Sequence, residues 1–184
     1  YLILWNSRFK KIFQKLKDEQ ESFWNAERRQ KAADKNLTTA QVYTMASIVE
    51  EETNKAEDKP LIASVYINRL KNGTKLEADP TVKYAMRDFG LKRILHGHLA
   101  FESPYNTYRN TGLPPGPICT PSSKTIDAVL DAPNTNYIFF VAKPDFKGYS
   151  NFAATYEEHM VFAKAYQKAL DSLILSKQQN AAAQ

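Results

Sequence analysis

The chain contains an apolar helical segment that ends on three consecutive carboxylates. Residues 44–53 read Thr-Met-Ala-Ser-Ile-Val-Glu-Glu-Glu-Thr, and Thr38 or Thr39 is suited to cap a helix that runs to about Asn54. At about 100° per residue, the three glutamates cannot all face water. One of them must lie on the apolar side, where burial raises the pKa of a carboxyl group toward the range that a general acid needs near neutral pH.

Helical phase separates the three glutamates. The apolar sector of this helix is formed by Val42, Met45, Ile48 and Val49. Glu52 projects about 45° from the centre of that sector, Glu50 about 115° and Glu51 about 145°. Glu51 is therefore predicted to face solvent, Glu50 to lie at the border and Glu52 to turn inward, with Thr53 near the centre of the sector. A buried Glu52 is either a catalytic acid or the partner of a basic residue such as Arg69 in a structural ion pair.

The composition fits one domain, or one domain with a helical extension. The 184 residues are 43% hydrophobic and 12% aromatic, which is enough for a core. With a net charge of +5, basic residues on the first predicted helices form either a solvated face or a surface for an anionic polymer or membrane: Lys10, Lys11, Lys15, Lys17, Arg28, Arg29 and Lys31. The sequence carries no phosphate loop, zinc-spaced Cys/His set or RNA-binding motif, so no cofactor, metal or nucleic acid is expected.

The cysteine content and the first residues add two expectations. Cys119 is the sole cysteine, which excludes an intrachain disulfide. No run approaches the ~20 apolar residues of a membrane span, and no signal peptide is found. The chain opens on Tyr-Leu-Ile-Leu-Trp without an initiator methionine, which favours a fragment of a longer protein.

Periodicity predicts helices over much of the chain. Residues 3–34 are expected to be helix-rich, with apolar residues near helical spacing at Ile3, Phe9, Ile12, Phe13, Leu16, Phe23 and Trp24. A further helix is predicted from Pro60 to Lys71 and is closed by Gly73. Residues 76–82 are expected to be extended. Shorter helices are predicted over 81–89 and 123–130, and a long one over 155–177.

Strands are expected only near the C-terminal end. Residues 137–142, Tyr-Ile-Phe-Phe-Val-Ala, form the clearest strand, and residues 148–152 are its expected partner. Runs of helices with a few strands between them favour an α+β fold. We therefore predict a helix-rich domain with a small antiparallel sheet and a long Pro/Gly-rich loop over residues 103–123.

Polar groups in three places are candidates for ligand contact. Asn68 and Arg69 either orient a sugar ring or a carboxylate, or serve in capping and surface pairing. Asp79, in an Asp-Pro-Thr turn with Thr81, either belongs to a site or caps the following helix. In the Pro/Gly-rich loop, tyrosine faces stack on sugars and Asn and Thr bind hydroxyl or acetamido groups, although the loop is equally suited to a packed structural role. The loop candidates are Tyr105, Asn106, Thr107, Tyr108, Gly112, Leu113 and Pro114.

The histidines are given no catalytic role from the sequence. His159 lies on the last predicted helix and is expected to be structural or exposed. His96 and His98 flank Gly97 in a predicted loop, without carboxylate or cysteine partners at metal spacing, so no metal site is expected there.

Together these segments resemble the YceG-like family, the endolytic murein transglycosylases. The matching segments follow the family's order over nearly all of residues 40–170: 44–53, 63–70, 76–82, 105–108, 111–118, Pro121, 137–142 and 152–159. Cys119 departs from the small residue usual there, and residues 89–102 have no assigned counterpart. The resemblance implies that Glu52, the Glu immediately before Thr in Ile-Val-Glu-x-Glu-Thr, is the catalytic acid, with Glu50 and Thr53 in support.

The resemblance also implies a groove and a domain layout. The groove would be lined by Asn68, Arg69, Asp79, Thr81, Tyr105, Asn106, Thr107, Tyr108, Gly112, Leu113 and Pro114. Residues 1–37 would be a helical lead-in, 38–177 the catalytic domain and 178–184 a disordered tail. Members carry a membrane anchor and a LysM-like module ahead of this domain, so the parent protein would act at the extracytoplasmic face of the bacterial inner membrane.

The implied activity is cleavage of the MurNAc–GlcNAc β-1,4 bond inside peptidoglycan strands. One carboxyl group suffices, because the C6 hydroxyl of the substrate attacks and leaves a 1,6-anhydroMurNAc end. The expected consequence is a limit on glycan strand length, with cell-wall synthases as partners. Two alternatives stay open: a muramidase-type hydrolase with Asp79 as its second carboxylate, and a non-catalytic glycan-binding module.

Overall fold

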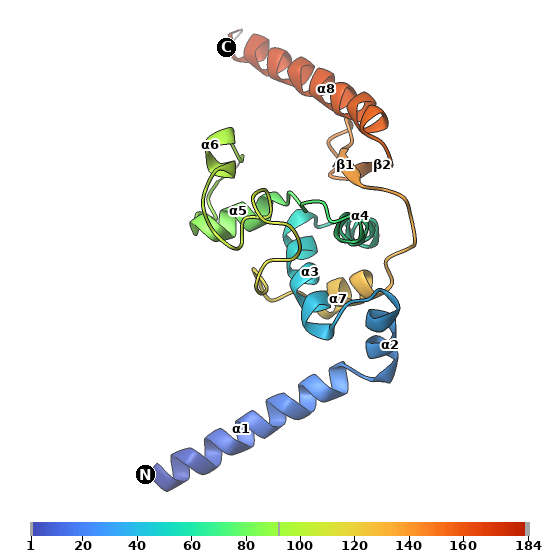
Figure 1. Ribbon diagram of the computed structural model, residues 1–184. Coiled ribbons are helices and arrows are strands. Elements are labelled where there is room, and N and C mark those ends of the chain that lie inside the picture. The colour runs from blue at the N-terminus through green and yellow to red at the C-terminus, as the bar shows by residue number, and fades with distance from the viewer. Residues whose placement is uncertain (1, 92, 183–184) are drawn as a thin grey trace. The chain divides into compact units, whose positions relative to one another are not determined.

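A computed structural model describes residues 2–91 and 93–182 and divides the chain into two compact units, Tyr1–Thr39 and Ala40–Gln184 (Figure 1). In the first unit, helix α1 spans Leu2–Phe23 and α2 spans Ala26–Asp34. Asn25 caps α2 by accepting a hydrogen bond from the backbone N–H of Arg28 at 2.9 Å. Trp24 is buried and meets the ring of Phe23 edge-on.

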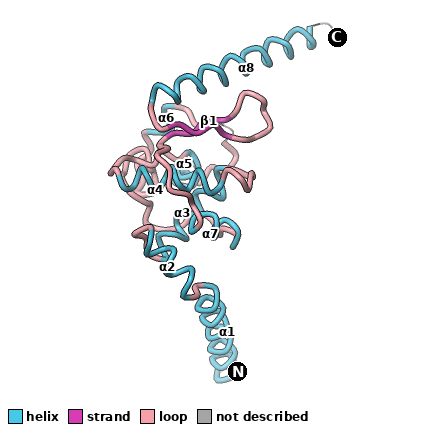
Figure 2. The backbone as a smooth tube through the Cα atoms, turned by 90° about the vertical axis from the view of Figure 1, so that its right-hand side faces the viewer, coloured by secondary structure: helices cyan, strands magenta, loops and turns pink. Residues whose placement is uncertain are grey.

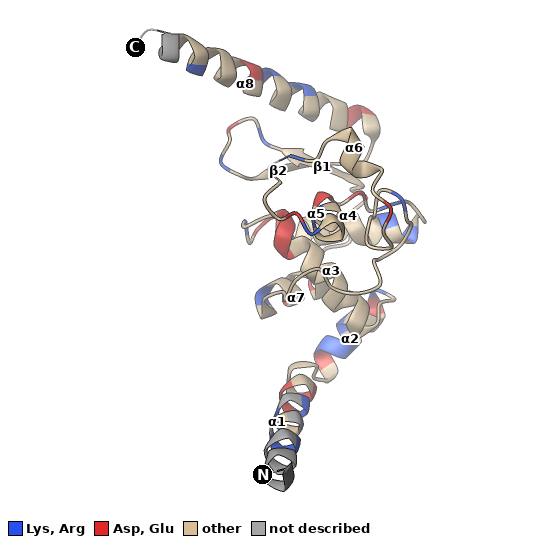
Figure 3. Ribbon diagram, turned by 90° about the vertical axis from the view of Figure 1, so that its left-hand side faces the viewer, with Lys and Arg blue, Asp and Glu red and all other residues tan. Residues whose placement is uncertain are grey.

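In the coloured part of α1, basic and acidic residues are mixed, as Figure 3 shows. The side chains of Lys10, Lys11, Lys15 and Lys17 are exposed, and Lys15 pairs with Glu19 at 3.7 Å. This arrangement agrees with a solvated helix face. The predicted apolar positions Ile3, Phe9, Phe13 and Leu16 lie outside the residues whose side chains are described.

Four helices build the centre of the second unit. They are α3 (Thr39–Glu52), α4 (Lys59–Lys71), α5 (Asp79–Met86) and α7 (Ser123–Leu130). The apolar sector predicted for the first of these helices is confirmed, because its four residues are fully buried: Val42, Met45, Ile48 and Val49. They share the core with residues of the other three helices, among them Ile62, Val65, Tyr66, Val82 and Val129.

The expected ends of α4 are also confirmed. Pro60 lies in its first turn, where a missing N–H costs nothing. Gly73 takes the left-handed conformation, with φ of +65°, and its N–H donates to the carbonyl of Leu70 at 3.1 Å. Helix α4 therefore ends where the sequence predicts, and the chain turns back toward α5.

A two-stranded antiparallel sheet lies between α4 and the last helix (Figure 2). Strand β1 covers Phe139–Ala142 and β2 covers Ser150–Ala153, with Phe140 opposite Phe152. Helix α8 (Tyr156–Ala182) packs its first part on both strands. Asp58, just before α4, accepts the backbone N–H of Ser150 at 2.7 Å and so ties the hairpin to that helix. The α+β fold with a small antiparallel sheet is confirmed.

The structure corrects several predicted boundaries. Helix α5 begins at Asp79 rather than residue 81, because Pro80 fits a first helical turn. A four-residue helix, α6 (His96–Leu99), occupies a segment expected to be a loop. Helix α8 continues to Ala182, because glutamine and alanine sustain a helix. The expected disordered tail from residue 178 is therefore helical up to Ala182, and its last two residues, 183–184, lie outside the described residues.

Candidate active site

Glu52 is the last residue of α3 and is half-buried against the neighbouring helix. The hydroxyl of Tyr66, on α4, donates a hydrogen bond to Glu52 Oε1 at 2.5 Å. The pKa of Glu52 is raised from 4.5 to about 7 overall. Burial is the largest cause and raises it, the hydrogen bond from Tyr66 lowers it, the negative charge of Asp79 raises it, and the charge of Lys83 lowers it. Glu52 is thus a carboxyl group that exchanges its proton near neutral pH.

The other two glutamates of the triplet have different surroundings, although all three are consecutive residues at the end of α3. Glu51 is exposed, as the helical phase predicts. Glu50 is half-buried and forms an ion pair with Lys59 at 3.0 Å, and it also accepts a hydrogen bond from Ser122 at 3.2 Å. Although burial alone would raise the pKa of Glu50, hydrogen bonds and the charge of Lys59 lower it overall. The glutamate of this triplet that forms a structural ion pair is therefore Glu50, with Lys59 as its partner.

The raised pKa of Glu52 has a consequence for stability. Between pH 4.5 and 7 the folded chain holds this proton more tightly than the unfolded chain, so the free energy of unfolding falls as pH rises. We expect Glu52→Gln to be more stable than wild type by about 2–3 kcal/mol above pH 7, and to show no difference near pH 4. Urea unfolding at pH 4, 6 and 8 measures this. A constant difference across the three pH values would contradict the raised pKa.

A pocket of about 430 Å³ opens beside Glu52. Its walls are partly aromatic and partly charged and consist of Glu52, Arg69, Leu76, Glu77, Asp79, Tyr108, Phe139, Phe140, Tyr156 and His159. Asp79 accepts a hydrogen bond from the Tyr108 hydroxyl at 2.6 Å. Of the two alternatives left open for Asp79, the capping of α5 is wrong, because Ala78 occupies the cap position and no side chain caps that helix end. The carboxylate of Asp79 is instead held at the pocket.

Two further hollows adjoin this pocket. One, of about 680 Å³, also includes Glu52 in its lining, together with Glu50, Thr53 and Gly148. The other, of about 450 Å³, shares Arg69, Glu77 and Phe139 with the pocket. Glu52 therefore lies between two hollows, and an extended ligand has room on both sides of it.

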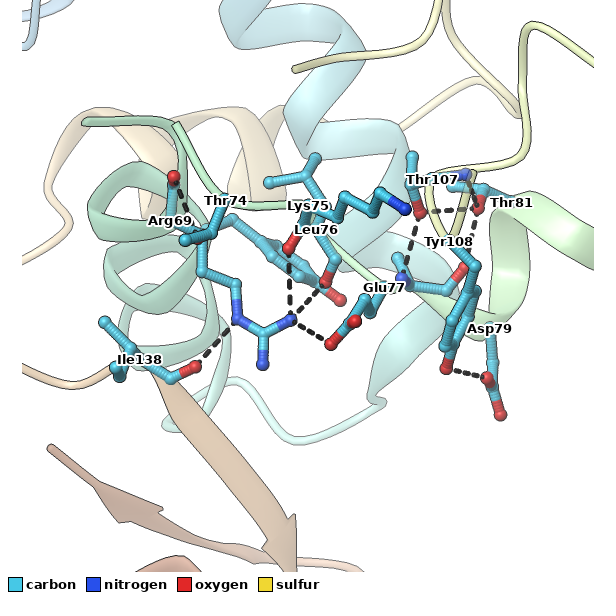
Figure 4. A network of polar contacts seen from close by, with 12 residues as sticks. Arg69, Thr74, Lys75, Leu76, Glu77, Asp79, Thr81, Thr107, Tyr108 and Ile138 are labelled. Carbon is cyan, nitrogen blue, oxygen red and sulfur yellow. Dashed lines mark hydrogen bonds and ion pairs between the residues drawn. The ribbon is translucent and has the colours of Figure 1, made fainter. Parts of the chain in front are cut away.

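Arg69 lines two of these hollows, and Figure 4 shows the hydrogen bonds that hold its guanidinium group. Its Nε donates to the carbonyl of Ile138 at 2.7 Å, and Nη1 donates to the carbonyl of Leu76 at 2.8 Å and to Glu77 at 3.1 Å. Glu77 has a positive φ of 53°, an uncommon conformation for a residue with a side chain. Arg69 therefore connects α4, β1 and the segment before α5, and its guanidinium is held in one orientation at the pocket wall.

Four predicted groove residues make hydrogen bonds within the fold. Asn68 donates to the carbonyls of Thr135 and Tyr137, each at 2.9 Å, and does not line the pocket. Thr81 and Thr107 are buried, and their hydroxyls lie 2.9 Å apart. Asn106 is fully buried; it donates to the carbonyls of Leu99 and Phe101 and accepts from the N–H of Tyr108. Their polar atoms bind backbone groups or one another within the fold, and the expectation that they contact substrate stays a prediction.

The remaining candidates lie outside the pocket of Glu52. Tyr105 packs against Tyr84 with ring centroids 4.8 Å apart. Pro114 is buried, while Gly112 and Leu113 belong to the same loop without lining the pocket. Thr53 borders the second hollow, and its hydroxyl accepts the N–H of Lys55 at 3.0 Å, which is a local turn bond.

Several residues around Glu52 are not among those that the sequence patterns single out. Tyr66 is buried on α4, and the need of a buried tyrosine for a partner to its hydroxyl is the signal that could have found it. His159, expected to be structural or exposed, stacks on Phe139 with centroids 5.1 Å apart and lines the pocket. Burial lowers the pKa of His159, and so does the charge of Arg69. Phe139, Phe140 and Tyr156 reach the pocket because β1 packs on α4 and α8 packs on both strands, an arrangement that no local pattern encodes.

The described residues hold no group of three or more His, Cys, Asp or Glu side chains placed to bind a metal ion. Within the same part of the chain, no helix is long and apolar enough to cross a membrane. Glu52 offers proton transfer from a carboxyl group with a pKa near 7, beside aromatic surfaces and a second carboxylate. This is the class of site found in enzymes that work by general acid and base catalysis.

Comparison with known proteins gives the family. A model of the YceG-like family matches residues 1–165, so the chain belongs to the YceG-like family. An endolytic murein transglycosylase of Bacillus subtilis is 41% identical over 136 residues, which is 74% of this chain and 36% of that protein. An endolytic murein transglycosylase of Streptococcus pneumoniae is 36% identical over 129 residues, or 68% of this chain and 23% of that protein.

A solved structure shares the fold. The 2.6 Å crystal structure of a putative yceG-like protein from Listeria monocytogenes superimposes with a TM-score of 0.66 at 36% identity, covering 73% of this chain and 43% of that one. The chain thus spans between about a quarter and a half of the length of these three proteins.

Proposed function

We propose that this chain carries the catalytic site of an endolytic murein transglycosylase, with Glu52 as the acid and base. The observation that carries the proposal is the pKa of Glu52 near 7 at a position between two hollows. The names of the relatives support the substrate, which is peptidoglycan. Room on both sides of the acid suits a cut inside a glycan strand rather than at its end.

In the proposed reaction, protonated Glu52 first gives its proton to the oxygen that joins MurNAc to GlcNAc. The bond from this oxygen to C1 of MurNAc breaks, and an oxocarbenium-like centre forms at C1. Glu52, now a carboxylate, takes the proton of the C6 hydroxyl of the same MurNAc while that oxygen bonds to C1. The products are a GlcNAc with a free hydroxyl and a 1,6-anhydroMurNAc end. Glu52 regains its proton, and no water is consumed.

The other pocket groups have supporting parts in this proposal. The aromatic side chains Phe139 and Tyr156 offer faces on which sugar rings stack. Asp79 places negative charge beside the centre that becomes positive, and Tyr108 holds its carboxylate in place. Arg69 orients the substrate from the pocket wall.

A hydrolase of the same bond is the second candidate, because Asp79 lines the same pocket as Glu52. In that reading Asp79 activates a water molecule, and the product ends in a reducing sugar. A glycan-binding module without activity would use the same hollows but would not need a carboxyl group with a raised pKa.

Product analysis separates the three functions. We expect purified peptidoglycan treated with the chain to yield 1,6-anhydroMurNAc ends, which are 18 mass units lighter than the hydrolysed ends because no water is added. Mass spectrometry of the released fragments, with and without borohydride reduction, distinguishes these ends. Reducing ends would support the hydrolase. Glycan binding without fragments would support the binding module.

Features of the whole protein belong to this proposal as well. We propose that residues 38–177 form the catalytic domain, that residues 1–37 lead into it, and that the parent protein is anchored at the extracytoplasmic face of the inner membrane. Its cuts would limit glycan strand length, with cell-wall synthases as partners. The family match over residues 1–165 supports the inclusion of the helical lead-in.

A further inference from the structure

The hydroxyl group of Tyr66 lies beside one particular oxygen of Glu52. It donates to Oε1 at 2.5 Å, which is in the range of a hydroxyl bonded to a carboxylate. Because Oε1 already accepts this proton, the proton of the neutral carboxyl group belongs on Oε2. The two oxygens of Glu52 are therefore not equivalent.

Tyr66 has little freedom to move away from this position. Its side chain is 1% exposed, and it meets the ring of Phe140 edge-on with centroids 6.0 Å apart. Phe140 pairs with Phe152 across the hairpin, and Ser150 of the same hairpin is bound to Asp58 ahead of α4. The hydroxyl is thus held from α4 and from the sheet.

We propose that Tyr66 is a positioning residue for catalysis, which binds Oε1 of Glu52 and leaves Oε2 as the oxygen that gives and takes the proton. The inference rests on the proposed function and adds to it the oxygen that reacts and the residue that selects it. The bond strengthens when Glu52 becomes a carboxylate, so Tyr66 favours proton release and opposes the effect of burial.

Other ionisable groups lie around Glu52. They are Glu50 and Glu51 on α3, Arg69 on α4, Glu77 in the segment before α5, Asp79 and Lys83 on α5, Tyr108 on the Pro/Gly-rich loop and His159 on α8. Asp79 raises the pKa of Glu52 and Lys83 lowers it. Substitutions at Tyr66 and Asp79 should therefore move the pKa of Glu52 in opposite directions.

The test is to measure the pKa of Glu52 directly by ¹³C NMR of its carboxyl carbon in the full chain. We expect Tyr66→Phe, which removes only a hydroxyl, to raise this pKa by about one pH unit. The pH at which the rate of glycan cleavage falls should shift to higher values by the same amount as this pKa. We also expect kcat to decrease about tenfold while KM changes little. Asp79→Asn should lower the pKa instead.

Tyr43→Phe is the matched control, because it removes a hydroxyl from α3 itself, away from the pocket. We expect the wild-type pKa and profile for this variant. An unchanged or lower pKa in Tyr66→Phe would overturn the inference, whereas activity retained by Glu52→Gln would overturn the proposed function instead. If Tyr66→Phe does not fold, an NMR titration of the wild-type chain tests the inference in its place. The Tyr66 Cζ resonance should then titrate together with Glu52, and a resonance that does not follow it would overturn the inference.

Discussion

Glu52→Gln should reduce peptidoglycan cleavage by about 10³-fold or more, because both halves of the proposed reaction pass through this carboxyl group. Glutamine keeps the shape of the side chain and still accepts the hydrogen bond from Tyr66, so the fold and glycan binding should persist. The measurement is the rate of release of anhydro ends by mass spectrometry, with pull-down on insoluble peptidoglycan as the binding assay.

Glu51→Gln is the matched control for this loss. It makes the same chemical change at the adjacent position, where the side chain faces solvent. We expect near wild-type cleavage from it. Glu50→Gln should instead lose stability, because it breaks the ion pair with Lys59. Full activity in Glu52→Gln, or loss in Glu51→Gln, would remove Glu52 from its assigned role.

Asn106→Asp should destabilise the chain by about 3 kcal/mol and lower its melting temperature by about 6–12 °C. The side-chain amide nitrogen of Asn106 donates to the carbonyls of Leu99 and Phe101 at 3.0 and 2.8 Å in a fully buried position. In the aspartate variant, a carboxylate oxygen would replace the amide nitrogen and would face the two carbonyl oxygens without a proton to share. The substitution would also bury a negative charge. Thermal unfolding followed by circular dichroism measures the loss, which should shrink at low pH as the new carboxyl group is protonated.

Asn110→Asp provides the comparison within the same loop. Asn110 makes similar bonds, to the carbonyls of Ser103 and Asn106, but it is exposed and water can replace its partners. We expect a change below about 1 kcal/mol. Equal losses from the two substitutions would contradict the structural role given to Asn106. Unchanged stability with lost glycan binding in Asn106→Asp would return that residue to the groove.

Local patterns predicted much of the fold. The boundaries of α3, α4 and α7 follow from periodicity, caps and the turn at Gly73, all of which act within a few residues of the chain. The hairpin was also predicted, because residues 137–142 are a run of mostly aromatic and β-branched residues and a second segment with aromatic residues, 148–152, follows shortly after it. Helix α6 was missed because four residues are too few to show a helical period.

Some residues of the site are also predictable from local patterns, and others are not. Helical phase distinguishes Glu52 from Glu51, since both belong to one helix and their relative direction is fixed by the backbone. The same local reasoning assigned Asn106 and Thr107 to a ligand, although their polar atoms bind backbone groups and a threonine far away in the chain. The type of a residue shows that its side chain can bind a sugar. It does not show which groups of the folded chain form hydrogen bonds with that side chain.

The sequence by itself determined the acidic helix end, the inward direction of Glu52 and the family. Only the tertiary structure decided what surrounds that carboxyl group. The pKa of Glu52 depends on burial, on the hydroxyl of Tyr66 and on the charge of Asp79, and the last two groups come from other segments. Electrostatic and hydrogen-bond energies depend on distances through space, and these distances are set only when the helices, the loop and the hairpin have packed together.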